Sequence, residues 1–247
     1  MARPEPRQLD VIAKRQVTPN MLRVTLGGAG MTDFPADQTS AYVKLRVPDA
    51  AAGREVVRTY TVRSHRTDAI DVDFALHEER GPATLWAMNA QAGDTIMVGG
   101  PGPRKLVHPG ADWYLLVGDM TALPAISGNL ELLPDTACGT AVIEIIDEAD
   151  IQDLQKPPHL GIEWVINPHP GRAGSLLAER VRAVGWRDGR PSVWAACEFT
   201  VMRQLRDYFR TERGLTSGNL YISSYWKAGL TEDNHKIAKR EDADALA

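Results

Sequence analysis

The stretch "RTYTVR", from Arg58 to Arg63, combines residue types that suit a flat, anionic ligand. Arg58 and Arg63 carry planar guanidinium groups that can bind a phosphate through paired hydrogen bonds. Tyr60 offers an aromatic face to a ring system, and the Thr61 hydroxyl or amide can hydrogen-bond to a ring nitrogen. The alternative is an exposed strand with scattered charges.

A second candidate for phosphate binding follows in "RGPATLW". Gly81 and Pro82 come immediately before Ala83 and Thr84, as the start of a helix requires. The free N–H groups of such a start and the Thr84 hydroxyl attract phosphate, although a plain helix cap would look the same. An arginine-rich strand followed by this helix start is more specific than either stretch alone and predicts that the flat, anionic ligand is FAD.

Two further turns lead from an apolar run into a helical pattern. "LLVGDMTALPAI" has Gly118, Asp119 and Thr121 at its turn, and "VWAACEF" has Glu198. The chain has no GxGxxG fingerprint, but the carboxyl ends of parallel strands are where α/β sheets bind ligands. Thr121 could instead serve as a helix cap. Glu198 could cap its helix or accept a hydrogen bond from a ribose, and the sequence leaves both possibilities open.

The elements that must position these residues fall into two groups. Residues 1–108 predict short, alternating strands and one short helix, which together indicate an antiparallel, six-stranded FAD-binding barrel. The strands are expected within residues 9–26 (two strands), 41–48, 55–64, 69–77 and 93–103, and the helix within 81–90. In 69–77, strict alternation places Ile70, Val72, Phe74 and Leu76 on one face.

Residues 109–230 predict a parallel sheet with helices on both faces, an α/β nucleotide-binding domain. The strands are expected within residues 113–119, 140–147, 162–167, 192–198 and 219–226, and the helices within 121–133, 175–185 and 200–214. Ser175 is expected to cap the second helix, and Gly185 to end it. The polar tail, residues 231–247, is expected to be either a short surface helix or partly disordered.

Composition excludes several classes of protein. The net charge of −4 argues against a nucleic-acid binder, and residues 1–108 hold 14 Lys and Arg against 12 Asp and Glu, whereas residues 109–247 hold 14 against 20. Cys138 and Cys197 lie in apolar stretches and are expected to be reduced thiols. We expect a cytoplasmic protein, because the N-terminus has no signal-peptide core and no apolar run reaches the ~20 residues of a membrane span. No set of ligand-type residues has the spacing of a metal site.

Five stretches together resemble the siderophore-interacting proteins, which are cytoplasmic, FAD-dependent ferric-siderophore reductases. They are "RTYTVR", "HEERGPATLWA", "GDMTALPAI", "WAACE" and "YWKAG", and the resemblance covers nearly the whole chain. It implies a ferredoxin-reductase-like fold and NADH, NADPH or ferredoxin as electron donor. Met120 and Cys197 stand where the family usually has glutamate and glycine. Both departures lie on the nicotinamide side and bear on the identity and affinity of the donor.

The resemblance also implies roles for individual residues. FAD would be held by Arg58, Tyr60, Thr61, Arg63, His77, Gly81, Ala83 and Thr84. The approach of the nicotinamide nucleotide would be lined by Gly118, Asp119, Thr121, Ala122, Ala196 and Glu198. Tyr225 and Trp226 could stack on the cofactor, or they could be core aromatics at the end of a strand.

An anionic ferric siderophore would need cations at its binding site. Lys44 lies on a strand expected beside "RTYTVR", and Lys236, Lys239 and Arg240 share a helical face in the tail, where a solvated charge run is the alternative. We expect a monomer that binds a ferric siderophore, with ferredoxin as a possible partner. The competing functions are a general NAD(P)H-dependent flavin or ferric reductase and a non-catalytic siderophore-binding protein.

Overall fold

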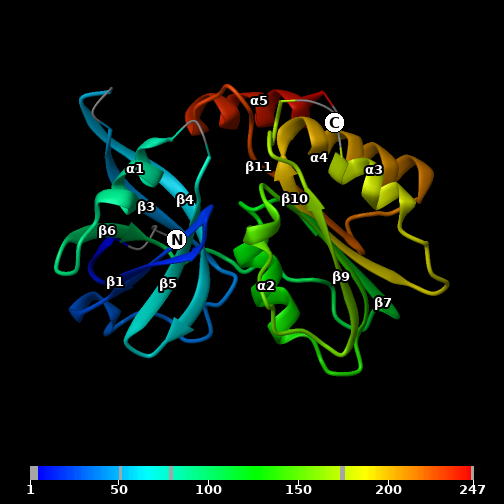
Figure 1. Cartoon of the computed structure of the whole chain (residues 1–247), viewed down its shortest axis with the longest axis horizontal. Helices are drawn as coiled ribbons and strands as arrows, with labels where there is room; N and C mark the ends of the chain where they lie inside the picture. Colours follow the sequence, from blue (N-terminus) through cyan, green and yellow to red (C-terminus); the bar gives the residue numbers. More distant parts are fainter. Residues whose placement is uncertain (1–4, 50–51, 78–79, 173–175, 246–247) are drawn as a thin grey trace. The chain divides into compact units, whose positions relative to one another are not determined.

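The computed structural model describes residues 5–49, 52–77, 80–172 and 176–245. The chain divides into two compact units, residues 1–105 and 106–247, and each has its own hydrophobic core (Figure 1). Below, we refer to them as the barrel unit and the sheet unit.

The barrel unit is a closed, six-stranded antiparallel barrel with the strand order β1-β2-β5-β4-β3-β6, which confirms the predicted fold. The strands are β1 (Arg7–Thr18), β2 (Met21–Gly27), β3 (Tyr42–Asp49), β4 (Arg54–Arg66), β5 (Ala69–Ala75) and β6 (Thr95–Gly99), and the helices are η1 (Ala29–Met31) and α1 (Pro82–Asn89). Ile70, Val72 and Phe74 are fully buried, which confirms the predicted inward face of β5 for these three residues, whereas Leu76 lies beyond the end of the strand and packs partly buried against the core. The alternation arises because successive residues of a strand point to opposite faces.

β3 lies between β4 and β6 in the barrel wall. Its pairing with β4 sets Lys44 opposite Thr59 and Tyr42 opposite Thr61, and its pairing with β6 sets Lys44 opposite Gly99. Residues directly opposite one another share a face of the sheet. Lys44 and Thr59 therefore point to the same side of the barrel wall.

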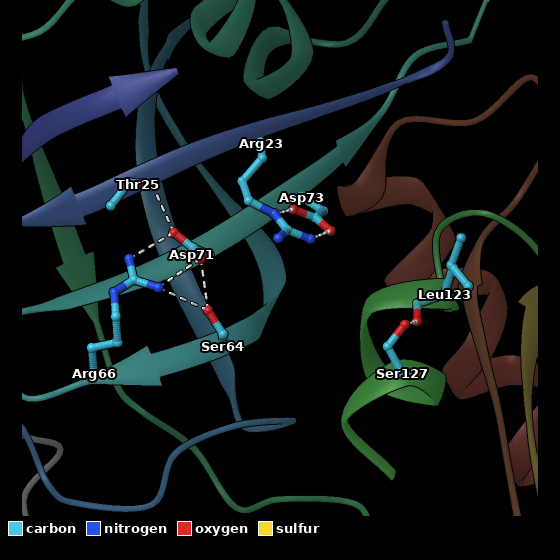
Figure 2. Close-up of polar contacts among 8 residues, drawn as sticks. All are labelled: Arg23, Thr25, Ser64, Arg66, Asp71, Asp73, Leu123 and Ser127. Carbon is cyan, nitrogen blue, oxygen red and sulfur yellow. Dashed lines mark hydrogen bonds and ion pairs between the residues drawn. The ribbon is translucent and has the colours of Figure 1, made fainter. Parts of the chain in front are cut away.

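The buried carboxylate of Asp71 organises a polar cluster on β2, β4 and β5 (Figure 2). Its donors are the Thr25 hydroxyl at 2.7 Å, the Ser64 hydroxyl at 2.7 Å, and the Arg66 guanidinium at 2.8 and 3.0 Å. Burial alone would raise the pKa of Asp71, but these hydrogen bonds outweigh it and hold the pKa well below its usual range. Arg66 thus has a structural partner within the barrel.

A second ion pair lies beside this cluster on β2 and β5. The Arg23 guanidinium donates two hydrogen bonds to the Asp73 carboxylate, at 2.5 and 2.7 Å (Figure 2). Bidentate geometry of this kind is among the stronger arrangements for a charged pair. Asp71 and Asp73, the polar positions of the alternating β5 pattern, are therefore both buried and paired, with exposed fractions of 6% and 5%.

The sheet unit is built on a five-stranded parallel sheet with the order β11-β10-β7-β8-β9. The strands are β7 (Trp113–Gly118), β8 (Cys138–Ile145), β9 (His159–Ile166), β10 (Pro191–Glu198) and β11 (Leu220–Trp226). The helices are α2 (Leu123–Leu132), η2 (Glu148–Asp150), α3 (Leu176–Ala183), α4 (Phe199–Asp207), the π-helical turn η3 (Tyr208–Glu212) and α5 (Glu232–Asp244). α2 covers one face, and α3 and α4 cover the other (Figure 1), so the predicted α/β fold is confirmed. The predicted cap Ser175 lies outside the described residues.

The polar tail forms α5, so the helix is the alternative that the structure supports. α5 packs on the sheet unit through a buried imidazole and an ion pair. His235 Nε2 lies 2.8 Å from the Ser224 hydroxyl of β11, and the Arg206 guanidinium of α4 donates to the Asp242 carboxylate at 2.5 and 3.0 Å. The helix is thereby tied to β11 and to α4.

Two expectations from composition concern cysteines and membrane spans. Cys138 and Cys197 are both free thiols, as expected. Among the described residues, no helix has the length and apolar character of a bilayer-spanning segment.

Candidate functional site

The FAD-binding candidates on β4 are half-buried, including the guanidinium-bearing residues. The Tyr60 ring packs on Phe74 with centroids 4.4 Å apart, and Phe74 in turn lies 6.0 Å from Trp86 of α1. This chain of aromatic rings links β4 to α1 through β5. Arg58 and Arg63 are likewise half-buried, whereas Thr59 between them is exposed.

The start of α1 lacks a capping side chain. Gly81 is the N-cap residue, and among the described residues no side chain accepts a hydrogen bond from the first turn, which contains no acidic residue. Ala83 and Thr84 are buried in this turn, and a Cβ added at Gly81 would meet nothing within 4 Å. The N-terminal N–H groups of a helix attract anions. The donors of this helix start and the β4 guanidinium groups fit the phosphates of FAD, and the half-buried Tyr60 fits its ring.

His77, the remaining FAD candidate of the barrel unit, lies two residues after the end of β5 and is half-buried. Thr61 of β4 is also half-buried and lies opposite Tyr42. The structure therefore brings all the barrel candidates onto β4, the end of β5 and the start of α1.

In the sheet unit, Asp119 joins three segments at the carboxyl edge of the sheet. Oδ1 accepts from the Thr121 N–H at 2.9 Å and the Thr121 hydroxyl at 2.5 Å, and Oδ2 accepts from the Glu198 N–H at 2.9 Å and from Trp226 Nε1 at 2.8 Å. The residue is 4% exposed. Thr121 does not cap α2, because the N-cap position belongs to Ala122. Asp119 thus holds together the chain segments that follow β7, β10 and β11.

Glu198 is the N-cap of α4. Its Oε2 accepts from the Thr200 N–H at 2.5 Å and the Val201 N–H at 3.2 Å, and its Oε1 accepts from the Ala228 N–H at 3.3 Å. Only 5% of the residue is exposed. Of the two alternatives for Glu198, the structure shows the helix cap.

Gly118 lies where β7, β10 and α2 approach one another closely. A Cβ at Gly118 would come within 2.7 Å of Ala122 Cβ and 2.8 Å of the Ala196 carbonyl oxygen. The absence of a side chain therefore lets the helix pack against the strands. Gly118, Ala122 and Ala196, all predicted for the nicotinamide side, form one small contact next to Asp119.

Glu144 is a buried carboxyl group at the same edge that the sequence interpretation missed. It is 8% exposed on β8. Its pKa is raised to about 7, chiefly by burial; the hydrogen bond with Asn167 opposes the increase, and the charges of Asp119 and Glu198 add to it. The available signal was a single charge inside the apolar run "AVIEII". Among the described residues, no group of three or more His, Cys, Asp or Glu side chains could hold a metal ion.

Cys197, one of the two departures from the family pattern, is 1% exposed on β10. Burial raises the pKa of its thiol well above the usual value, and the carboxylates of Asp119, Glu144 and Glu198 raise it further. A buried thiol that resists ionisation is a poor nucleophile. Cys197 is therefore a packing residue of this edge.

The two aromatic candidates at the end of β11 make contacts inside the sheet unit. Tyr225 packs edge-on against the buried Trp194, with centroids 6.3 Å apart at 88°. The Trp226 indole N–H donates to the Asp119 carboxylate. The Trp226 ring also packs against Gly171, where an added Cβ would lie 2.9 Å from a ring carbon. These contacts account for both rings as packing residues, and stacking on the cofactor stays a prediction.

The candidate cations for a ferric siderophore differ in their surroundings. Lys44 is half-buried, and among the described residues no carboxylate lies within ion-pair distance of its ammonium group. Lys236 pairs with Glu232 at 3.0 Å, and Lys239 donates to the Ser223 hydroxyl at 2.7 Å. The two tail lysines thus take part in the structure of α5.

A closed antiparallel barrel followed by a parallel sheet of this order is the ferredoxin-reductase-like fold. Phthalate dioxygenase reductase shares it with a TM-score of 0.67 at 14% identity, covering 92% of this chain and 70% of that one. Within that class, residues 111–229 match the family model described as "Siderophore-interacting protein", and residues 10–55 and 49–105 match "Siderophore-interacting FAD-binding domain". The chain belongs to the siderophore-interacting protein family.

Individual relatives agree with this assignment. The ferric vibriobactin reductase ViuB of Vibrio cholerae is 34% identical over 92% of each chain. Among solved structures, the siderophore-interacting protein SipS from Aeromonas hydrophila is 28% identical, with a TM-score of 0.87 over 97% of this chain and 98% of that one. A siderophore utilization protein from T. fusca is 33% identical, with a TM-score of 0.83 over 92% and 94%.

Proposed function

We propose that this protein is a flavin-dependent ferric-siderophore reductase. The observation that carries the proposal is the combination, in one barrel, of the half-buried "RTYTVR" strand with an uncapped helix start that has no carboxylate in its first turn. That barrel matches a siderophore-interacting FAD-binding domain, and a relative with 34% identity is named a ferric vibriobactin reductase.

The barrel unit would hold FAD. Arg58, Arg63 and the N–H groups at the start of α1 would bind its phosphates, because charged and helix-terminal donors both favour anions. Tyr60, Thr61 and His77 would contact the ring and the groups next to it. Bound FAD would accept two electrons from a donor and release them singly to Fe(III).

The electron donor would be NADH, NADPH or ferredoxin. For a nicotinamide donor, the carboxyl edge of the sheet unit is the proposed approach, since α/β sheets bind ligands there. The residues concerned are Gly118, Asp119, Thr121, Ala122, Ala196 and Glu198.

The substrate would be an Fe(III)-siderophore complex in the cytoplasm, and the protein would act as a monomer. Lys44 is the cation best suited to attract an anionic complex, because no described carboxylate neutralises it. Arg240 of α5 would be a further cation for this ligand, and Lys236 and Lys239 would contribute to a lesser extent, since both already have partners within the sheet unit. Fe(II) binds hard oxygen donors less tightly than Fe(III), so reduction would loosen the iron.

Turnover with an iron trap tests the function. Purified protein is mixed with a ferric siderophore, NADH or NADPH and a chromogenic Fe(II) chelator. We expect Fe(II) to appear at a rate proportional to the flavin-loaded enzyme, and apoprotein supplied with the same donor to be inactive. Flavin-independent activity, or loaded protein that is inactive with nicotinamide, ferredoxin and chemical reductants alike, would contradict the proposal.

A further inference from the structure

Two strand-to-helix connections at the carboxyl edge of the sheet unit lie within the described residues. They lead from β7 into α2 and from β10 into α4. The N-terminus of such a helix is where an α/β fold commonly places the pyrophosphate of a dinucleotide, because its N–H groups are unpaired. In this chain, groups of the protein itself accept hydrogen bonds from the Thr200 and Val201 N–H groups at α4 and from the Thr121, Ala122 and Leu123 N–H groups at α2.

At α4, a carboxylate occupies the position that a phosphate would take. Glu198 accepts hydrogen bonds from the Thr200 and Val201 N–H groups and is 5% exposed. An incoming phosphate would have to displace this carboxylate or approach against its charge. Like charges at close range disfavour such binding.

At α2, the turn closes on its own backbone. The Ala122 and Leu123 N–H groups both donate to the Asp119 carbonyl oxygen, at 2.9 and 3.1 Å, and Pro124 has no N–H. The side chains of Ala122 and Leu123 are no more than 1% exposed. The Thr121 N–H, the last donor before the helix, is bonded to the Asp119 carboxylate.

The charges facing this edge are mainly negative. Besides Asp119 and Glu198, Glu144 is buried on β8. On the β11 side, Lys227 lies over the Phe199 ring, with its ammonium 4.5 Å from the ring centroid. The edge therefore combines filled helix starts with fixed carboxylates.

We propose that Glu198 and Asp119 determine donor specificity by filling the phosphate positions at α4 and α2, so that a nicotinamide donor is recognised without its pyrophosphate. The inference rests on the proposed use of a nicotinamide donor. It implies that the adenosine half of NADH or NADPH adds little affinity. The donor class is then any small nicotinamide nucleotide, with weak discrimination between NADH, NADPH and the mononucleotide.

Binding of unreactive, oxidised nucleotides tests this directly. The FAD-loaded, oxidised protein is titrated calorimetrically with NAD⁺, NADP⁺ and nicotinamide mononucleotide. We expect the three dissociation constants to lie within about tenfold, which corresponds to about 1.4 kcal/mol. A dinucleotide that binds more than about tenfold tighter than the mononucleotide would overturn the proposal. If none of the three oxidised nucleotides binds at millimolar concentration, the second-order rate constants of flavin reduction by NADH, NADPH and the reduced mononucleotide are compared instead. A rate constant for a dinucleotide more than about tenfold above that for the mononucleotide would then overturn the proposal.

A charge-removing variant adds a second test. Glu198→Gln keeps an oxygen that can cap α4 but removes the negative charge, so NAD⁺ and NADP⁺ should gain affinity several-fold relative to nicotinamide riboside, which carries no phosphate. The matched control is Glu212→Gln at the far end of the same helical segment, where the carboxylate pairs with Arg182 on the surface. If Glu198→Gln does not change the affinity of the dinucleotides relative to the riboside, the proposed role of Glu198 is overturned. If the variant does not fold, the ratio of dinucleotide to mononucleotide dissociation constants in the parent protein decides alone.

Failure of this inference is distinguishable from failure of the proposed function. Oxidation of the dithionite-reduced protein by a ferric siderophore uses no nicotinamide. A protein that passes that test yet prefers a dinucleotide strongly would remain a ferric-siderophore reductase with a conventional donor site.

Discussion

At the scale of single residues, Glu144 shows how burial raises the pKa of a carboxyl group into the neutral pH range. It is 8% exposed and lies near the carboxylates of Asp119 and Glu198, which explains why its pKa rises to about 7 from an ordinary 4.5. The folded protein therefore holds this proton more tightly than the unfolded chain does. The stabilising contribution is fully present below pH 4.5 and is lost as the pH rises to 7.

Glu144→Gln should remove that pH dependence. In the parent, this group should lower the free energy of unfolding by about 3 kcal/mol between pH 4.5 and 7, at 1.36 kcal/mol per unit of pKa shift. The variant keeps a polar partner for Asn167 without the charge. Urea unfolding of both proteins at pH 5 and pH 8 measures the difference, and Glu163→Gln, a surface ion-pair partner of Arg180, is the control. An equal loss of stability in parent and variant would show that Glu144 is not the titrating group.

Lys44 should help the ferric complex to bind without affecting flavin reduction. A solvent-accessible ion pair contributes about 0.2–1 kcal/mol, so Lys44→Ala should raise the half-saturating concentration of an anionic ferric siderophore by at most about fivefold. Lys44→Glu should raise it further, and added salt should narrow the gap by screening. The measurement is reoxidation of reduced enzyme at low and high salt. Arg15→Glu on β1 makes the same charge change elsewhere, and equal curves for Lys44→Glu and Arg15→Glu would remove Lys44 from the site.

At the scale of elements, the start of α1 is the part of the proposed flavin site that a single substitution can test most directly. Gly81 is exposed, has an extended backbone (φ −74°, ψ 169°) and has open space where a Cβ would lie. A side chain can therefore be added without strain. The same substitution can strengthen the helix and weaken cofactor binding, because a capping carboxylate occupies the phosphate position.

Gly81→Asp should stabilise the apoprotein by a few tenths of a kcal/mol, as an N-cap does relative to glycine. It should weaken FAD binding by about tenfold or more, because its charge repels the phosphate. Gly81→Ser is the neutral control and should keep the gain in stability with a smaller loss of affinity. Apoprotein melting and FAD titration give the two quantities. FAD affinity that is equal in Asp and Ser variants would mean that the phosphates lie away from this helix start.

Most elements could be predicted because their patterns are local. Strict alternation identified β5, and the helical spacing of buried residues identified α2 and α4. Leu133 was expected within the helix at residues 121–133. It is instead the C-cap residue of α2 and has an extended backbone, because the helix ends at Leu132. The polar tail gave no such signal, because α5 is held by Arg206 and Ser224, which lie far from it in sequence.

The sequence predicted where the site candidates lie in the fold, but it did not predict their hydrogen-bond partners. Asp119, Glu198 and Trp226 lie together as the parallel strands require, yet their hydrogen bonds to one another depend on side-chain directions that spacing does not determine. The same limit explains why Glu144 was missed, since its neighbours Asp119 and Asn167 lie on other strands. For Arg66, the partner Asp71 lies diagonally across the β4–β5 pair, in which Arg66 is opposite Ala69 and Asp71 is opposite Ser64, and the sequence pattern of either strand alone does not reveal this pairing.

At the scale of the whole molecule, the chain forms two compact units with separate cores, and we propose a separate task for each. The proposed flavin contacts lie mainly in the barrel unit, and the proposed donor contacts lie in the sheet unit. The acidic residues of the second half and the slight positive excess of the first half agree with an anionic substrate that is attracted to the barrel unit.

The central claim is that the reduced flavoprotein passes electrons to a ferric siderophore. The most direct measurement is anaerobic mixing of dithionite-reduced, FAD-loaded protein, freed of excess reductant, with increasing ferric siderophore in the presence of an Fe(II) chelator. We predict that the flavin absorbance returns at a rate that rises with siderophore concentration, with about two Fe(II) formed per FAD, because the flavin carries two electrons. Flavin that stays reduced, while the protein still binds the siderophore, would contradict the account.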